Sequence, residues 1–228
     1  MTPRTYGVVL AVALVLCFAS LLLAIGGGCA LPAARTPRVD LTVEQQERQA
    51  VWIDVYCAGF DDASPIAPTF WASGGIVSDR HVLTARHVVD GCPGSIPRIR
   101  VRVPGDDQPY AMAWFRELRG DEVLLERADA GRWSWARRPR PGTAVLGDRV
   151  CAETAAPLRR RQCGDVKERY VRDVGHAGAF VRYEFDTTPG NSGSLLYDRL
   201  GHLVGVHSAH QPGSTRAYMV PIDWTRLP

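Results

Sequence analysis

The sequence predicts an all-β protein, either a sandwich or a barrel, over residues 51–228. From Val51 onward, short runs rich in β-branched and aromatic residues follow one another closely, among them VWIDVYC, HVLTA, RIRVRV and AYMVPI. Gly, Pro, Asp and Ser separate these runs, and no long stretch with helical periodicity interrupts them. Many short strands with turn residues between them are typical of all-β domains. A soft boundary near residues 130–142 divides the region into two halves of similar size.

Residues 1–29 have the pattern of a targeting segment. Arg4 is followed by the apolar run VVLAVALVLCFASLLLAI, which leads through GGG to Cys29. A positive charge before an apolar run of about 18 residues predicts an export signal or a membrane anchor. The end of the run is similar to a bacterial lipoprotein signal, which makes Cys29 a candidate lipidation site, although Gly26 stands where that signal usually has leucine. A cleaved signal near Ala30–Ala34 and an uncleaved anchor are the alternatives, and all three place the rest of the chain outside the cytoplasm.

Residues 30–50 begin polar and proline-containing and become weakly helical, which predicts a linker and a short helix. The net charge of the whole chain is only +3, so a polyanionic partner such as nucleic acid is not expected. The arginine runs at 137–140 and 159–161 are interpreted as solvated loops.

The cysteines of the exported part favour disulfides over a metal site. Four remain beyond the targeting segment: Cys57, Cys92, Cys151 and Cys163. No CxxC pair is present, which argues against zinc, and an even count in an oxidising compartment suggests two disulfides. Three pairings are possible, of which we favour Cys57–Cys92 and Cys151–Cys163. The second pair would close a short loop between neighbouring strands.

Three stretches carry residues suited to nucleophilic catalysis. His87 lies where the strand HVLTA passes into a helical turn, Asp121 directly precedes the apolar strand VLL, and Ser192 lies within TPGNSGS. Each has an ordinary interpretation alone: a surface histidine, an acid before a strand, and a Gly/Ser loop. The order His, Asp, Ser is one of the chain orders known for a nucleophilic triad. Together they predict a general base, a carboxylate that orients it, and a nucleophile.

The stretches LTARH, DEVLL and GNSGS resemble the LTAAH, D-hydrophobic-A-L-L and GNSGG motifs of the trypsin-like serine peptidases. The resemblance covers about residues 51–224. It implies two six-stranded antiparallel Greek-key β-barrels, at 51–135 and 140–224, with the active site in the cleft between them. It also implies a serine endopeptidase that acts on protein or peptide substrates through an acyl-enzyme, without metal or cofactor.

The same resemblance assigns the oxyanion hole to the backbone amides of Gly190 and Ser192. Family members that are activated by cleavage carry Asp immediately before the serine, where it pairs with a new N-terminal amine. The residue here is the neutral Asn191, so no activation of that kind is expected.

DTTPGNSGS and VGVHS are most similar to the bacterial V8-like glutamyl endopeptidases. In that group a threonine and a histidine bind an acidic side chain before the scissile bond, which implies these roles for Thr187 and His207. Arg216 is expected near the base of the same pocket. The alternatives are an HtrA-like envelope quality-control protease, here expected without its PDZ module because the chain ends at Pro228, and a non-catalytic binding protein on the same fold. A membrane association through the N-terminal lipid or anchor is expected.

Overall fold

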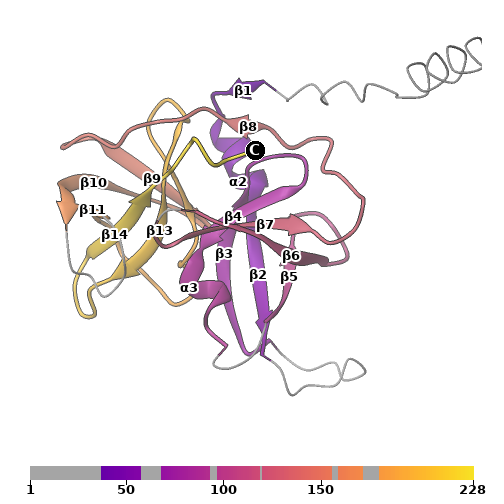
Figure 1. The fold of residues 1–228 in the computed structure, drawn as a ribbon. Coiled ribbons are helices and arrows are strands. Elements are labelled where there is room, and N and C mark those ends of the chain that lie inside the picture. The colour runs from indigo at the N-terminus through magenta and orange to yellow at the C-terminus, as the bar shows by residue number, and fades with distance from the viewer. Residues whose placement is uncertain (1–36, 58–67, 93–96, 119, 156–158, 172–179) are drawn as a thin grey trace, which may run out of the picture. The chain divides into compact units, whose positions relative to one another are not determined.

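The structure is a computed structural model that describes residues 37–57, 68–92, 97–118, 120–155, 159–171 and 180–228 (Figure 1). The chain divides into a unit of residues 1–35 and a unit of residues 36–228, and every described residue belongs to the second unit. The predicted export segment, with Cys29, therefore lies outside the described residues. Within the described ranges, no helix is both long enough and apolar enough to cross a membrane.

Two closed antiparallel barrels of six strands each make up most of the described chain (Figure 1). The first barrel has the strand order β2-β3-β4-β7-β6-β5, and the second has the order β10-β11-β14-β13-β12-β9. Numbered from the first strand of each barrel, both orders are 1-2-3-6-5-4, so the two halves share one topology. The predicted double-barrel fold is confirmed.

The strands of the first barrel are β2 (Ala50–Tyr56), β3 (Phe70–Ile76), β4 (His81–Ala85), β5 (Arg98–Arg102), β6 (Tyr110–Glu117) and β7 (Glu122–Arg127). Those of the second are β9 (Arg149–Thr154), β10 (Arg160–Val171), β11 (Phe180–Glu184), β12 (Leu195–Tyr197), β13 (Leu203–His210) and β14 (Arg216–Pro221).

Few of the described elements lie outside the barrels. The short strands β1 (Arg38–Val39) and β8 (Arg138–Pro139) pair in parallel. Helix α2 (Val43–Gln49) begins with a capping box, in which Thr42 and Gln45 each satisfy the other's backbone N–H, and runs directly into β2. Helix α3 (Arg86–Val89) is a single turn after β4.

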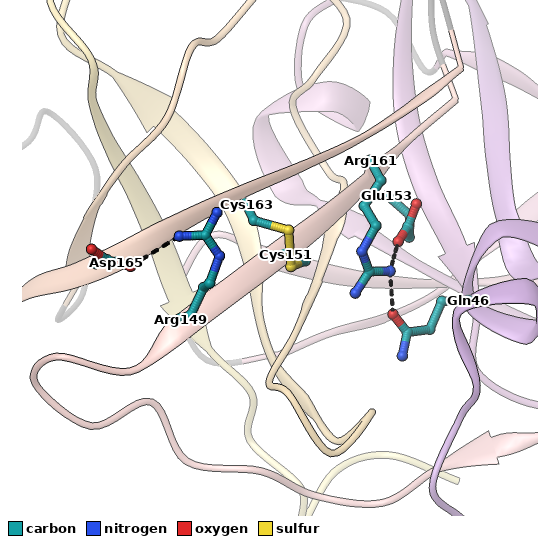
Figure 2. Close-up of a disulfide and its surroundings, with 7 residues drawn as sticks. All are labelled: Gln46, Arg149, Cys151, Glu153, Arg161, Cys163 and Asp165. Atoms are coloured by element: carbon teal, nitrogen blue, oxygen red, sulfur yellow. Dashed lines mark hydrogen bonds and ion pairs between the residues drawn. A yellow bond between two sulfur atoms is a disulfide. The ribbon is translucent and has the colours of Figure 1, made fainter.

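Both predicted disulfides are present. Cys57 bonds to Cys92, which joins the end of β2 to the segment after α3. Cys151 bonds to Cys163, its direct cross-strand partner in the β9–β10 pair (Figure 2). Two disulfides are typical of a protein that resides in an oxidising compartment outside the cytoplasm.

The interpretation of residues 137–140 and 159–161 as solvated loops was wrong, because Arg138 is buried in β8 and Arg160 and Arg161 lie in β10. Arg161 lies in β10 directly opposite the buried Glu153 of β9, forms an ion pair with it, and also donates to Gln46 of α2 at 2.9 Å (Figure 2). The guanidinium of Arg159 donates to the carbonyl of Glu47 at 2.6 Å. Arg159 and Arg161 therefore connect α2 to the second barrel. They supply hydrogen-bond donors to a buried carboxylate and to a carbonyl of the helix.

The barrels share part of their apolar core. Leu195 and Tyr197 of β12 and Val206 of β13 are buried in the same cluster as the first-barrel residues, although their strands belong to the second barrel. Leu195 lies directly against the α-carbon of Gly75, where an added Cβ would come within 2.2 Å of its side chain. This shared packing sets the spacing of the two barrels where the candidate site lies.

Candidate active site

His87 and Asp121 are brought together by the pairing of β4 with β7. Ala85 at the end of β4 pairs with Glu122 at the start of β7, so the residues just beyond them, in α3 and before β7, are neighbours. Asp121 accepts two hydrogen bonds from His87: from the ring Nδ1 to Oδ2 at 2.6 Å, and from the backbone N–H to Oδ1 at 2.9 Å. A carboxylate only accepts, so Nδ1 carries the proton and Nε2 is left as the basic nitrogen.

Ser208 supplies a third hydrogen bond to this carboxylate, and the sequence did not single it out. Its hydroxyl donates to Oδ2 of Asp121 from the second barrel, and both residues are buried. Burial alone would raise the pKa of Asp121, but the hydrogen bonds from His87 and Ser208 outweigh it and lower the pKa. The carboxylate therefore stays ionised. The available sequence signal was the position of Ser208, immediately after the candidate pocket residue His207.

Ser192 lies half-buried in a loop that both barrels hold. Its carbonyl accepts from the backbone N–H of Ser73 in β3 at 2.9 Å, and the next amide, that of Gly193, donates to the carbonyl of His207 in β13 at 2.8 Å. Gly193 has a φ of 85°, and a Cβ there would lie 2.0 Å from Oγ1 of Thr84. Only glycine allows both this backbone conformation and this close approach.

The amide of Ser192 has a defined direction. The carbonyl of Asn191, in the same peptide unit, accepts from the N–H of Ser194 at 3.0 Å. In a planar trans peptide the N–H points opposite to the C=O, so the Ser192 N–H points away from that turn. Gly190 has a φ of 93°, which a residue with a side chain rarely adopts. This geometry is compatible with the oxyanion role expected for the amides of Gly190 and Ser192.

Asn191 is held by neutral partners. It is 1% exposed, its Nδ2 donates to Oε1 of Gln162 in β10 at 3.2 Å, and its Oδ1 accepts from the hydroxyl of Thr188 at 3.2 Å. The loop is thus held from within the second barrel without a charged residue at this position.

The expected pocket residues have different environments. His207 is buried in β13, with Nδ1 2.6 Å from the hydroxyl of Tyr183 and its ring edge-on to Phe185. Burial lowers the pKa of His207 to about 3, so the ring is neutral. Thr187 is half-buried on the loop after β11. Arg216, expected at the base of the pocket, instead lies exposed at the start of β14, 3.4 Å from the side-chain oxygen of Gln211.

No group of three or more His, Cys, Asp or Glu side chains in the described part of the chain is arranged to hold a metal ion. The site consists of protein groups that can donate, accept and transfer protons.

Residues 72–206 match the trypsin-like peptidase domain family. The chain belongs to this family. The match includes the histidine, aspartate and serine segments described above and spans parts of both barrels.

Among curated relatives, exfoliative toxin A of Staphylococcus aureus is 26% identical over 156 residues, covering 60% of this chain and 56% of the toxin. The chain thus spans about half the length of this relative. Among solved structures, the MamO protease domain from Magnetospirillum magneticum is 22% identical with a TM-score of 0.58, covering 79% of this chain and 95% of that domain. An HtrA-type protease, AlgW, solved with a tripeptide, is 15% identical with a TM-score of 0.63, covering 80% of this chain and 59% of that one. The two structural likenesses support the trypsin-like double-barrel fold.

Proposed function

We propose that this trypsin-like peptidase is an exported serine endopeptidase whose catalytic residues are His87, Asp121 and Ser192. The observation that carries the proposal is the pair of hydrogen bonds from His87 to an ionised, buried Asp121, which leaves Nε2 of His87 as a base. Ser192 is the matching nucleophile, because its loop is bonded both to β3 and to the residue that precedes Ser208.

The reaction follows from these groups. Oγ of Ser192 attacks the carbonyl carbon of the scissile peptide while Nε2 of His87 takes its proton. The amides of Gly190 and Ser192 stabilise the oxyanion that forms. His87 then protonates the leaving amine, and water hydrolyses the acyl-enzyme by the same steps in reverse order. Asp121 stabilises the imidazolium throughout.

An active-site phosphonate probe tests this chemistry. The wild-type chain should be labelled on Ser192 and should cleave peptides, and Ser192→Ala should do neither. Ser194→Ala is a matched control two residues away. Its hydroxyl is buried and has no hydrogen-bond partner in the described chain, so its loss should leave labelling and cleavage intact. An unlabelled wild type would favour a non-catalytic binding protein on this fold.

We further propose a preference for Glu or Asp before the scissile bond, bound by Thr187 and His207. The support is the neutral state of His207: a hydroxyl that donates to Nδ1 from Tyr183 leaves Nε2–H as a donor for a carboxylate. Because this recognition needs no positive charge on the ring, the preference should persist from pH 5 to pH 8.

Paired peptides that differ only in Glu or Gln before the cleaved bond test the preference. Thr187→Val removes one hydroxyl with little change of shape, and should lower kcat/KM for the Glu peptide by about 10- to 100-fold, with a smaller effect on Gln. Equal cleavage of the two peptides by the wild type would contradict the acidic preference. Preferential cleavage after Arg or Lys would instead indicate that Asp186, which is exposed beside Thr187, binds the side chain before the scissile bond.

Export is proposed on two grounds: the apolar run that ends at Cys29, and the two disulfides. Lipidation of Cys29 would tether the peptidase to a membrane surface in the periplasm or on the cell surface.

A further inference from the structure

We infer that Ser73, a residue of the first barrel, is a positioning residue that keeps the oxyanion-hole loop of the second barrel in its active shape. The inference rests on the proposed serine-peptidase function. Ser73 lies in β3, is 0% exposed, and is 117 residues away in sequence from Gly190, whose carbonyl it contacts.

The hydroxyl of Ser73 makes two hydrogen bonds at once. It donates to the carbonyl oxygen of Gly190 at 2.8 Å and accepts from the backbone N–H of Ala155, just after β9, at 3.2 Å. A hydroxyl has one proton to give and lone pairs to share, so both bonds can form together. Ser73 therefore links β3, the end of β9 and the Gly190–Ser194 loop at one buried point.

The backbone of Ser73 holds the same loop at a second position. Its N–H donates to the carbonyl of Ser192 at 2.9 Å. Each carbonyl that Ser73 binds belongs to a peptide unit whose N–H is bonded as well: that of Asn191 to the Thr188 carbonyl at 3.1 Å, and that of Gly193 to the His207 carbonyl at 2.8 Å. Two planar units are thus fixed at both ends. The N–H of Ser192 belongs to the peptide unit between these two. Because both flanking units are fixed, the direction in which this N–H points is fixed as well.

Ser73 is itself fixed by the strand that leads to the catalytic histidine. The hydroxyl of Thr84, which is 0% exposed, donates to the carbonyl of Ser73 at 2.8 Å. Thr84 lies in β4, three residues before His87. The barrel that supplies the base therefore also sets the shape of the loop that supplies the nucleophile and the oxyanion donors.

Ser73→Ala tests the inference because it removes the hydroxyl alone. The phosphonate counts the active sites, and kcat is calculated per site counted. This kcat should fall by about 10- to 100-fold, while KM should change by less than about twofold. A peptide aldehyde, whose adduct places an oxyanion in the hole, should bind more weakly by a similar factor. A merely structural defect would reduce the number of titratable sites without changing these two quantities.

Ser78→Ala is the matched control. Ser78 is also a buried first-barrel serine, with Oγ 2.6 Å from Nδ1 of His81, in the turn between β3 and β4 and away from the loop. It should keep kcat and aldehyde affinity. If Ser73→Ala does not fold, the isosteric Thr84→Val gives the decisive measurement, with a smaller loss of kcat and aldehyde affinity expected and KM unchanged.

The inference is overturned if the wild type is an active peptidase and Ser73→Ala keeps the wild-type kcat and aldehyde affinity per titrated site. Where Ser73→Ala does not fold, the same result in Thr84→Val overturns it. An unlabelled and inactive wild type would overturn the proposed function, and this inference with it.

Discussion

Glu122 places a neutral carboxyl group directly beside the ionised Asp121. Its side chain is fully buried, and neither carboxyl oxygen has a side-chain or backbone partner that meets hydrogen-bond geometry among the described residues. Burial raises the pKa of Glu122 to about 9; the nearby backbone amide of Asp223 opposes this rise, and the charges of Asp223 and Asp121 add to it. Two adjacent residues thus have opposite protonation states at neutral pH, because hydrogen bonds from His87 and Ser208 outweigh burial at Asp121, whereas burial dominates at Glu122.

This difference predicts a pH-dependent stability. The pKa of Glu122 in the folded protein, about 9, lies above the ordinary value of 4.5 for the unfolded chain, so folding takes up a proton between these pH values. The stability contributed by the protonated form is therefore complete below about pH 4.5 and is lost as the pH rises towards 9. Glu122→Gln cannot ionise, so its free energy of unfolding should gain on the wild type by about 1.4 kcal/mol per pH unit between pH 6 and pH 8.

Urea unfolding at several pH values, with the disulfides intact, measures this gain. Glu122→Leu, which also cannot ionise, is the control. Its free energy of unfolding should gain on the wild type by the same amount per pH unit, although its different shape changes the stability by a constant amount at every pH. Parallel stability curves for the wild type and both variants would show that Glu122 is ionised in the folded protein.

At the scale of strands and loops, the residues that the sequence identified are those inside short contiguous motifs. His87, Asp121 and Ser192 each come with a local pattern: a strand end, a strand start and a glycine-rich turn. Ser73 could not be recognised in this way, because its importance depends on Gly190, 117 residues later. No local pattern encodes which strand of one barrel faces which loop of the other.

Strand register explains where two of the arginines lie. Arg161 pairs across the β9–β10 ladder with Glu153, and this cross-strand partner made a charged run part of the structure rather than a solvated loop. Arg216 precedes the buried Ala217 in β14, so alternation along the strand turns its side chain towards solvent. The sequence predicted that these strands exist, but their side-chain orientation depends on register.

At the scale of the molecule, the site depends on the spacing of two barrels that share one apolar interface. The close contact of Leu195 with Gly75 sets this spacing, since Gly75 lies two residues after Ser73 on β3 and Leu195 lies three residues after Ser192. A change in this contact should therefore alter both stability and the hydrogen bonds between Ser73 and the loop.

A double-mutant cycle tests this dependence. In Gly75→Ala the new methyl would lie 2.2 Å from Cδ1 and 2.5 Å from Cγ of Leu195, which should destabilise the protein by about 1–3 kcal/mol and lower kcat. Leu195→Ala alone leaves a cavity and should cost about 2–5 kcal/mol. The combined variant keeps only the Cβ of residue 195, 3.5 Å from the added methyl, so the clash disappears and part of the cavity is filled. Its loss of unfolding free energy should be smaller than the sum of the single losses by about 1 kcal/mol or more.

The kcat of the combined variant should also exceed that of Gly75→Ala, because the barrels return to their original spacing. Additive losses with no recovery of kcat would mean that the barrel spacing does not depend on this contact.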